Sequence, residues 1–330
     1  MKVGVKDIAQ KAGVSPATVS NVLNQRANVS QSVRNRVLDI CREMDYHVKT
    51  AKKLRQASNT GTVLFIFSDF NRQFYLKVLQ GVNDYVCAHG YHLIICTCSS
   101  YERFMTSRFT NGCIMLDSHC TNEFLVEKAR QGYPIVTLDR SLDEANICNL
   151  LVNNYKPMAE LVTGLVERGY RDFAFLGGLD TLDTQERYTA FRDVLARNGI
   201  PFPRERYLTG DFRQKSGNRI AQLLMISENL PEVLVCANDD MAIGAIQAFR
   251  AEGIRIPEDI AVTGFDGLPL TRVLDLTTVV IPFYERGYLA AQHLLSLIEG
   301  EPGVASHLYL QAKVKWRGSV QAAVGERQKV

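Results

Sequence analysis

Apolar residues in the first 44 positions recur at the spacing of an α-helix in three short segments. Each segment has one apolar stripe and is otherwise polar, which predicts three amphipathic helices around a small shared core. The apolar positions are Ile8, Ala9 and Ala12 in the first segment, Val19, Val22 and Leu23 in the second, and Val33, Val37, Ile40, Cys41 and Met44 in the third. The pattern therefore predicts a small all-helical domain over residues 1–46.

The residues between these segments carry the stop and start signals of helices. Gly13 follows the last periodic residue and suits the left-handed position past a helix end. Ser15 can cap the second helix, and Pro16 suits its first position because proline lacks only an N–H that would stay unbonded there. Ser30 can cap the third helix. A turn of this length is typical of a helix-turn-helix, whose second helix lies in the major groove of DNA.

The outer face of the second helix is the predicted DNA-reading surface. Its members are Ser15, Pro16, Ala17, Thr18, Ser20, Asn21 and Asn24. An asparagine amide pairs best with N6 and N7 of adenine, so Asn21 is expected to be the main base reader. Thr18 and Ser20 are expected on phosphates. Pro16 and Ala17 offer no hydrogen bond to a base.

Charge is concentrated at this end of the chain. Residues 1–60 hold 11 Lys and Arg against 4 Asp and Glu, a net charge of +7, whereas the whole chain is +3 (38 minus 35), so the remainder carries −4 (27 minus 31). A basic segment of this kind is what binding to the phosphate backbone requires. The alternative, a small helical domain with no ligand, does not account for this asymmetry.

Residues 47–61 have the composition of a connector, rich in Lys, Arg, Gln, Ser and Asn. Within it, residues 50–56 can form about two turns of helix, which would be marginal alone in water. We expect this hinge helix to order only on DNA, with Lys52 and Lys53 among the residues that contact DNA.

From residue 62 onward, apolar strands alternate with amphipathic helices. Continuous apolar strands separated by helices predict parallel sheets covered on both faces, here an α/β core of two doubly wound lobes. The predicted strands are residues 63–68, 93–97, 113–117, 135–139, 150–152, 173–177, 233–237 and 260–264, and the predicted helices are 74–89, 156–168, 186–198, 214–227 and 241–252.

Polar residues follow several of these strands. Asp139 and Arg140 follow one strand, Asn238, Asp239 and Asp240 follow another, and Asp266 comes soon after a third. Ligands of doubly wound sheets bind beyond the carboxyl ends of the strands, and carboxylates, amides and guanidinium groups recognise vicinal hydroxyls. The alternative for each residue is a turn or a helix cap, and residues 238–240 directly precede a predicted helix that they could cap.

Length and composition narrow the class of protein. The 330 residues are 46% hydrophobic and 22% charged, which is typical of a globular chain of two or three domains. No apolar run approaches the roughly 18 residues of a membrane helix, and no apolar signal core is present, so a cytoplasmic protein is expected. The eight cysteines lack metal-ligand spacing and are expected to be buried reduced thiols. We expect no metal and no cofactor.

Four segments resemble the lactose/galactose-repressor (LacI/GalR) family of bacterial transcriptional regulators. They are residues 5–24, 238–245, 256–266 and 277–280. The resemblance implies a DNA-binding headpiece, a hinge helix and a core similar to periplasmic binding proteins, with two lobes joined by three crossing strands. It places the effector-binding core at 62–330, with lobe 1 over about 62–154 and 283–304 and lobe 2 over about 155–280 and 307–318.

The resemblance also implies roles for single residues. Leu54 corresponds to the hinge leucine that wedges into the minor groove and kinks the central base step. The residues that match the family's effector pocket are Phe74, Tyr75, Asp139, Arg187, Phe212, Asn238 and Asp266. For the aromatic residues, a place in the core is the alternative.

The sequence departs from the family pattern at three places. Asn21 stands where many members carry Arg or His, and the segment 46–49 lacks the Pro-Asn signal before the hinge helix. The segment 99–111 is short where the family usually has a full helix, which affects the expected dimer surface of the first lobe.

Together these features predict a sequence-specific transcriptional regulator, a repressor that binds a pseudo-palindromic DNA operator as a homodimer. Its operator affinity would depend on a small-molecule effector, a sugar or sugar derivative, bound between the lobes. The tail after residue 317 lacks heptads, so no coiled-coil tetramer is expected. The alternatives are a cytoplasmic sugar-binding protein and a sugar-modifying enzyme without a DNA role. Against an enzyme, the chain has no Walker-type loop, no nucleophile elbow and no clustered histidines.

Overall fold

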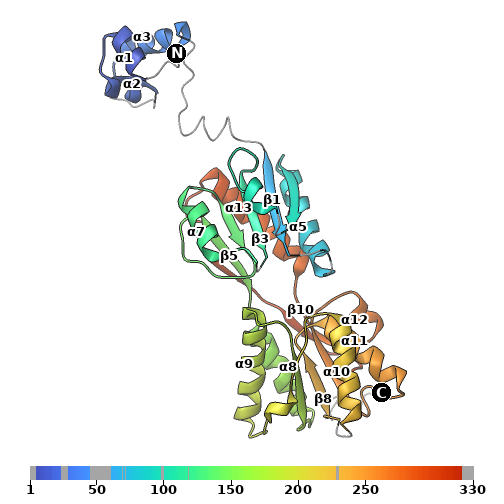
Figure 1. Ribbon diagram of the computed structural model, residues 1–330. Helices are drawn as coiled ribbons and strands as arrows, with labels where there is room; N and C mark the ends of the chain where they lie inside the picture. The colour runs from blue at the N-terminus through green and yellow to red at the C-terminus, as the bar shows by residue number, and fades with distance from the viewer. Residues whose placement is uncertain are drawn as a thin grey trace.

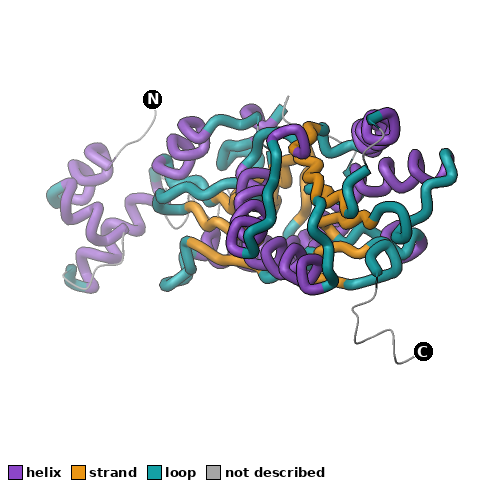
Figure 2. Tube along the Cα trace, turned by 90° about the horizontal axis from the view of Figure 1, so that it is seen from below, coloured by secondary structure: helices purple, strands orange, loops and turns teal. Residues whose placement is uncertain are grey.

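The computed structural model describes residues 5–23, 29–44, 61–68, 70, 72–97, 100–117, 119–227 and 230–321. These residues form a small helical headpiece and a two-lobed α/β core (Figure 1). Figure 2 shows the strands of the core running between helices that lie on their outer sides. The helices of the headpiece are α1 (Val5–Ala12), α2 (Pro16–Leu23) and α3 (Gln31–Glu43).

The headpiece confirms the predicted helix pattern. Ile8 and Val19 are fully buried where its helices meet, and Val37 of α3 completes this core. Gly13 has the left-handed φ of +65° that ends α1. The Ser15 hydroxyl accepts a hydrogen bond from the Thr18 amide at 3.0 Å, which caps the first turn of α2.

The first lobe is built on a six-stranded sheet in which every pair of neighbours is parallel. Its strand order is β11-β5-β4-β3-β1-β2. The strands are β1 (Thr62–Phe67), β2 (His92–Thr97), β3 (Gly112–Leu116), β4 (Ile135–Thr137), β5 (Ile147–Val152) and β11 (His307–Leu310). The helices are α5 (Phe74–Ala88), α6 (Tyr101–Phe104), α7 (Asn122–Arg130) and α13 (Phe283–Glu299).

The second lobe repeats this plan with the order β12-β10-β9-β8-β6-β7, where only β12 runs antiparallel to its neighbour. The strands are β6 (Phe173–Gly177), β7 (Tyr207–Thr209), β8 (Val233–Cys236), β9 (Ala261–Asp266), β10 (Thr277–Val280) and β12 (Lys313–Lys315). The helices are α8 (Tyr155–Glu167), α9 (Leu182–Arg197), the short η1 (Arg204–Arg206), α10 (Gln214–Ile226), α11 (Asp239–Ala251) and α12 (Leu270–Val273).

Burial explains this architecture. The central strands β3, β6, β8 and β9 are buried at every position, as expected of parallel strands covered by helices on both faces. Apart from the added outer strand, each lobe has the flavodoxin-like order 2-1-3-4-5, which confirms the predicted doubly wound α/β fold. In such sheets the carboxyl ends of the strands form the ligand-binding edge.

The chain crosses between the two sheets three times within the described residues. The crossings follow β5, β10 and β11. As a result α13, which comes late in the sequence, packs against α5 in the first lobe (Figure 1). The three crossings confirm what the family resemblance implies.

The sequence-based lobe boundaries need one correction. Residues 307–310 were expected in the second lobe together with 311–318, but they form β11, which pairs with β5 of the first sheet. Only β12 joins the second sheet, through β10. The physical reason is that the chain crosses between the lobes for the last time at 311–312. This crossing splits the short extended segment 307–315, so that its first part belongs to the first lobe and its last part to the second.

Other expectations are also tested by the structure. In the described residues 100–111 of the short segment after β2, the helix is the four-residue α6 and not a full-length helix, as the length of the segment predicts. All the described cysteines are free, and six of them are buried. Cys87 is exposed, contrary to the prediction that all the cysteines are buried.

None of the described helices is long and apolar enough to cross a membrane.

Candidate functional site

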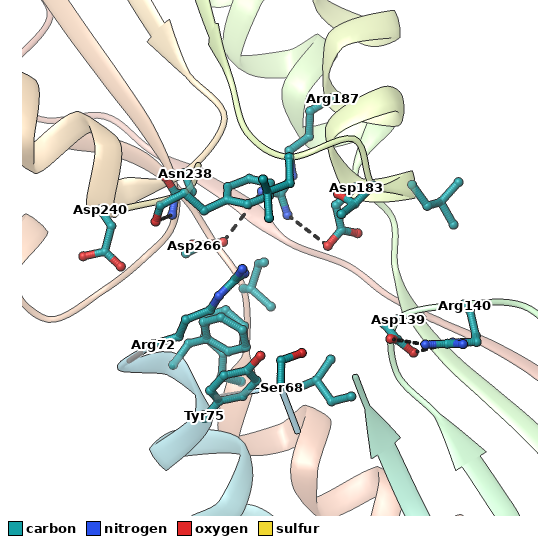
Figure 3. Close-up of a pocket in the computed structure, with 18 of the residues that line it drawn as sticks. Ser68, Arg72, Tyr75, Asp139, Arg140, Asp183, Arg187, Asn238, Asp240 and Asp266 are labelled. Carbon is teal, nitrogen blue, oxygen red and sulfur yellow. Dashed lines mark hydrogen bonds and ion pairs between the residues drawn. The ribbon is translucent and has the colours of Figure 1, made fainter. Parts of the chain in front are cut away.

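A cavity of about 290 Å³ lies between the two lobes, at the carboxyl ends of both sheets (Figure 3). Side chains from both lobes line it, so a ligand there would contact both. All seven residues that match the family pocket line this one cavity: Phe74, Tyr75, Asp139, Arg187, Phe212, Asn238 and Asp266.

Arg187 is the most extensively bonded side chain of this set. It lies on α9, which begins after Thr181, whose hydroxyl accepts from the Thr184 amide at 3.3 Å. Its Nε donates to Oδ1 of Asn154 at 2.9 Å, and its Nη1 donates to the Ala237 carbonyl at 2.7 Å. The side chain is only 4% exposed. These bonds hold the guanidinium in one orientation at the cavity.

Asp266 ends β9 opposite this guanidinium. One of its carboxylate oxygens lies 3.8 Å from Nη1 of Arg187. Burial raises the pKa of Asp266 well above its ordinary value; the charge of Arg187 lowers it and that of Asp239 raises it further. Its backbone has a φ of +123°, which is strained for a non-glycine residue, and such strain concentrates at functional sites.

Asp239 stands behind the cavity wall and fixes the loop that follows β9. Its carboxylate accepts hydrogen bonds from the Leu268 amide at 2.7 Å and from the Thr278 hydroxyl at 2.5 Å. Burial raises its pKa to about 6, although the Thr278 bond lowers it. The loop that starts at Asp266 is thereby tied to the start of α11 and to β10.

Asn238 has both of the roles that its sequence position allows. Its Oδ1 accepts from the Met241 amide at 3.1 Å, so it is the N-cap of α11, as the alternative interpretation holds. Its Nδ2 donates to the Phe212 carbonyl at 3.1 Å, and the side chain also lines the cavity. The cap therefore positions a polar group at the cavity edge.

Phe212 supplies an aromatic face on the second-lobe side. It has a left-handed φ of +65° and is 7% exposed. A Cβ at Gly178 would collide with its ring, so a glycine is needed beneath it. The guanidinium of Arg72, from the first lobe, lies 5.3 Å from the ring centroid. This cation–π contact spans the space between the lobes.

Asp139 and Arg140 form an ion pair on the first-lobe side (Figure 3). Two bonds join them, at 3.1 and 3.0 Å. Arg140 also donates to the carbonyls of Asp117 and Cys120 and to Oδ1 of Asn122. The charge of Asp139 is thus balanced by a guanidinium that is itself held by several acceptors.

Phe74 and Tyr75 pack against aromatic residues of the first lobe and also line the cavity. Phe74 stacks on Phe283 with ring centroids 4.8 Å apart, and Tyr75 meets Phe67 edge-on at 5.0 Å. Both also line the cavity. The core alternative therefore accounts for part of their burial, and they form the apolar wall of the first-lobe side.

Several cavity residues were not predicted from the sequence. They are Ser68, Arg72, Asn122, Asp183, Phe283 and Arg286. Asp183 occupies the first turn of α9, where acidic residues are ordinary. Arg286 carries no sequence signal, because its relation to the cavity depends on α13 returning to the first lobe.

The structure also tests the predicted DNA-reading face in part. Ser15, Pro16, Ala17 and Ser20 are exposed on α2, and Thr18 and Asn21 are partly exposed. Ser15 is engaged in its cap and bonds the Thr18 hydroxyl at 2.9 Å. Asn24, Lys52, Lys53 and Leu54 lie outside the described residues, so the hinge helix and its minor-groove wedge stay predictions. No group of three or more His, Cys, Asp or Glu within the described ranges could hold a metal ion.

Comparison with protein families gives two matches. The family described as "Bacterial regulatory proteins, lacI family" matches residues 4–48, which include the headpiece helices. The family described as "Periplasmic binding protein-like domain" matches residues 162–320, which cover the second lobe and the returning segments. The order of the two matches is the order of the headpiece and the core.

Whole-chain comparisons agree with these matches. The chain is 30% identical over 329 residues to the probable HTH-type transcriptional repressor ExuR of Bacillus subtilis (strain 168), covering 97% of this chain and 98% of that protein. It is 27% identical over 328 residues to the HTH-type transcriptional repressor CytR of Escherichia coli (strain K12), covering 96% of each.

Solved structures show the same fold. The CelR–cellobiose complex, also a transcriptional regulator, is 25% identical, with 96% of this chain and 100% of that chain covered and a TM-score of 0.70. The lac repressor dimer bound to operator and the anti-inducer ONPF is 23% identical, with 98% and 100% covered and a TM-score of 0.69. With a helix-turn-helix headpiece, a two-lobed core and a full-length relative at 30% identity, the chain belongs to the LacI family of bacterial regulatory proteins.

Proposed function

We propose that this LacI-family regulator is a cytoplasmic repressor that binds a pseudo-palindromic DNA operator as a homodimer. A small carbohydrate bound in the cavity between the lobes would control its operator affinity. The observation that carries the effector proposal is the single cavity in which Arg187, Asn238 and Asp266 of the second lobe face Tyr75 and Asp139 of the first.

The chemistry of this cavity suits a polyhydroxylated ring. Carboxylate oxygens accept from sugar hydroxyls, while the Arg187 guanidinium donates to them. The Phe212 ring offers an apolar face for the C–H side of a sugar. The similar CelR structure contains cellobiose, which supports a carbohydrate ligand here.

The location of the cavity suits an allosteric role. A ligand that contacts both lobes has a different affinity for each relative arrangement of them, and only such a difference can shift an equilibrium between states. The operator affinity would change by the same coupling free energy that operator DNA exerts on effector binding. The sign of this coupling, induction or corepression, is an outcome of the test below.

We further propose that the chain is not an enzyme. The similar full-length proteins are named repressors. Asp139 and Asp266 of the cavity lie beside the arginines Arg140 and Arg187 rather than beside a nucleophile that they could activate as a base. A sugar turned over at a steady rate by the purified chain would contradict this proposal.

The test begins with selection of operator DNA from a random pool by the full-length chain, followed by titration of the selected site with a panel of sugars. We expect a pseudo-palindromic site and at least one sugar that changes operator affinity about 5- to 150-fold. In Arg187→Ala this change should vanish, whereas in Arg192→Ala, an exposed arginine of the same helix, it should persist. No selected site would contradict the DNA proposal, and a selected site that no sugar affects would contradict the effector proposal.

A further inference from the structure

The charged groups of the cavity are unequally divided between the lobes. On the second-lobe side, Asp180, Asp183, Asp240 and Asp266 accompany the single arginine Arg187. On the first-lobe side the described lining residues include Arg72, Arg140 and Arg286, with Asp139 as the one carboxylate among them. The two sides therefore differ in sign, and the first-lobe side has more positive charge than its own carboxylate can balance.

Arg286 is the least satisfied of these arginines. The residue is only 7% exposed, and its Nη2 donates to the Leu138 carbonyl. Its Nε is buried without a hydrogen-bond partner among the described residues, and no described carboxylate oxygen lies within 4.0 Å of the guanidinium. Burial lowers the pKa of Arg286, whereas the charges of Asp183, Asp139 and Asp266 act in the opposite direction and raise it.

Two other arginines of the cavity, the partly exposed Arg140 and the buried Arg187, have more hydrogen-bond and ion-pair partners than Arg286. Arg140 is paired with Asp139 and donates to two carbonyls. Arg187 is bonded to Asn154 and Ala237. A buried charge without such partners costs free energy, and proteins keep such a group mainly where a ligand completes it.

The position of Arg286 is rigidly determined. The next residue, Gly287, lies so close to α5 that a Cβ there would collide with the Val78 carbonyl oxygen. Gly81 of α5 is packed as closely against the Tyr284 carbonyl. Because α13 and α5 meet backbone to backbone on both sides of Arg286, the guanidinium cannot leave the cavity by a shift of its helix.

Arg72 adds a second cation. Arg72 lies two residues before α5, and its guanidinium extends toward the second lobe (Figure 3). Within the described part of the chain, the contact of this guanidinium is with the Phe212 ring. A ring face does not neutralise a cation, so this guanidinium keeps its charge and its N–H donors for another partner.

We propose that the effector carries an anionic group, a carboxylate or a phosphate, which binds Arg286 and Arg72 on the first-lobe side. This inference rests on the carbohydrate effector proposed above and adds its charge and its orientation. The hydroxyl groups of the ligand face the carboxylates of the second lobe, while the planar guanidinium of Arg286, which lines the cavity, donates to the anion. The ligand is thus a sugar acid or a sugar phosphate.

Matched pairs of sugars test this proposal by calorimetry on the full-length chain. The pairs are glucuronate with glucose, galacturonate with galactose, and glucose 6-phosphate with glucose, so carboxylate and phosphate are separate arms. We expect one anionic member to bind at least about tenfold more tightly than its neutral counterpart, a difference of about 1.4 kcal/mol. In Arg286→Met the ratio of the affinities for the anionic and the neutral sugar should fall to about one. In the control Arg192→Met this ratio should stay at its original value.

A second variant, Arg72→Met, keeps the test decisive if Arg286→Met does not fold, because Arg72 is outside the buried packing of α13. In Arg72→Met the ratio of the affinities for the anionic and the neutral sugar should fall by at least about threefold. The proposal is overturned if neutral sugars bind as well as the anions, if no anion binds at up to about 10 mM, or if both variants keep the preference. Failure of operator selection would instead contradict the proposed function, which is measured separately.

Discussion

Nε of Arg187 donates a hydrogen bond to Oδ1 of Asn154 at 2.9 Å and thereby joins the cavity to the first crossing between the lobes. Asn154 stands between β5 of the first lobe and α8 of the second and is 1% exposed. Its Nδ2 donates to Asp183 at 2.8 Å and to Glu186 at 3.0 Å. A ligand that shifts the Arg187 guanidinium would therefore also shift Asn154, which lies in the segment that connects the two lobes.

Replacement of this asparagine should uncouple effector binding from operator binding. In Asn154→Ala we expect the effector-induced change in operator affinity to fall below about threefold, because Arg187 loses its bond to the crossing. Gel-shift titration of the selected operator, with and without the sugar found in the panel, measures this ratio. The free energy of unfolding should also drop, by about 1–3 kcal/mol, since buried partners are left unpaired.

Asn153→Ala is the matched control for that variant. Oδ1 of Asn153 accepts from the Lys156 amide at 3.0 Å at the start of the same helix. Among the described residues, the hydrogen bond to Arg187 comes from Asn154 and not from Asn153. We expect its stability to fall by about 1 kcal/mol, as for the loss of a helix cap, with coupling retained. An equal loss of coupling in both variants would mean that helix stability, and not the Arg187 contact, carries the signal.

Two substitutions of Asn238 should separate its cap from its role at the cavity. Asn238→Ala removes the acceptor for the Met241 amide and should lower the free energy of unfolding by about 1 kcal/mol. Asn238→Asp keeps this acceptor and suits the positive end of α11, so stability should be nearly retained. It nevertheless loses the donor to the Phe212 carbonyl and adds negative charge at the cavity.

We therefore expect Asn238→Asp to bind the sugar effector at least about tenfold more weakly in calorimetry while unfolding in urea near the original midpoint. Asn238→Ala should show the larger change in the midpoint. If effector affinity followed stability in both variants, the cap alone would explain why an asparagine is needed at this position.

The central strands were predictable because their physical signal is local. Parallel strands buried on both faces must be continuously apolar, and residues 173–177 show this in the sequence at the same bounds as β6. The outer strands β7, β11 and β12 have three or four residues with exposed positions, so neither length nor apolar continuity marks them. Their pairing depends on the crossings, which no local pattern encodes.

The residues of the candidate site also differ in whether a local sequence signal marks them. Asp139, Asn238 and Asp266 follow strands, so the strand-end rule alone points to them. Asn154 also follows a strand, β5, but the rule gives no sign that it bonds Arg187. Arg286 could not be found by that rule, because it lies on a helix that returns from the second lobe. The roles of both residues depend on contacts between distant parts of the chain. For Asn154 this is the hydrogen bond to Arg187, and for Arg286 it is the environment that leaves its Nε without a partner.

The raised pKa of Asp239, about 6, predicts how stability changes with pH. The ordinary pKa of an aspartate is about 3.9, so between about pH 4 and 6 the folded chain holds a proton that the unfolded chain has lost. This contribution is fully present below about pH 4 and is lost as the pH rises through 6. It amounts to about 3 kcal/mol at most.

Urea unfolding across this range measures the effect. The free energy of unfolding of the natural chain, relative to Asp239→Asn, should fall as the pH rises from about 4 to 6. Asp259 is a control of opposite sign, because the Arg255 guanidinium lowers its pKa to about 2. Relative to Asp259→Asn, stability should rise between about pH 2 and 4. A pH-independent difference for Asp239→Asn would show that Asp239 is ionised throughout.

Asn21 should determine one base of each operator half-site. It lies on α2, partly exposed beside the exposed Ser20, on the face that enters the major groove in a helix-turn-helix. Selection from randomised operators should return adenine at the position read by Asn21, and Asn21→Arg should change this preference to guanine, since arginine bonds its O6 and N7. Asn21→Gln, which keeps the amide, should retain adenine with weaker discrimination, whereas Asn21→Ala should lose about 1–3 kcal/mol of it. Should the base preference of Asn21→Arg match that of the natural chain at every position, specificity must come from DNA shape and the hinge segment instead.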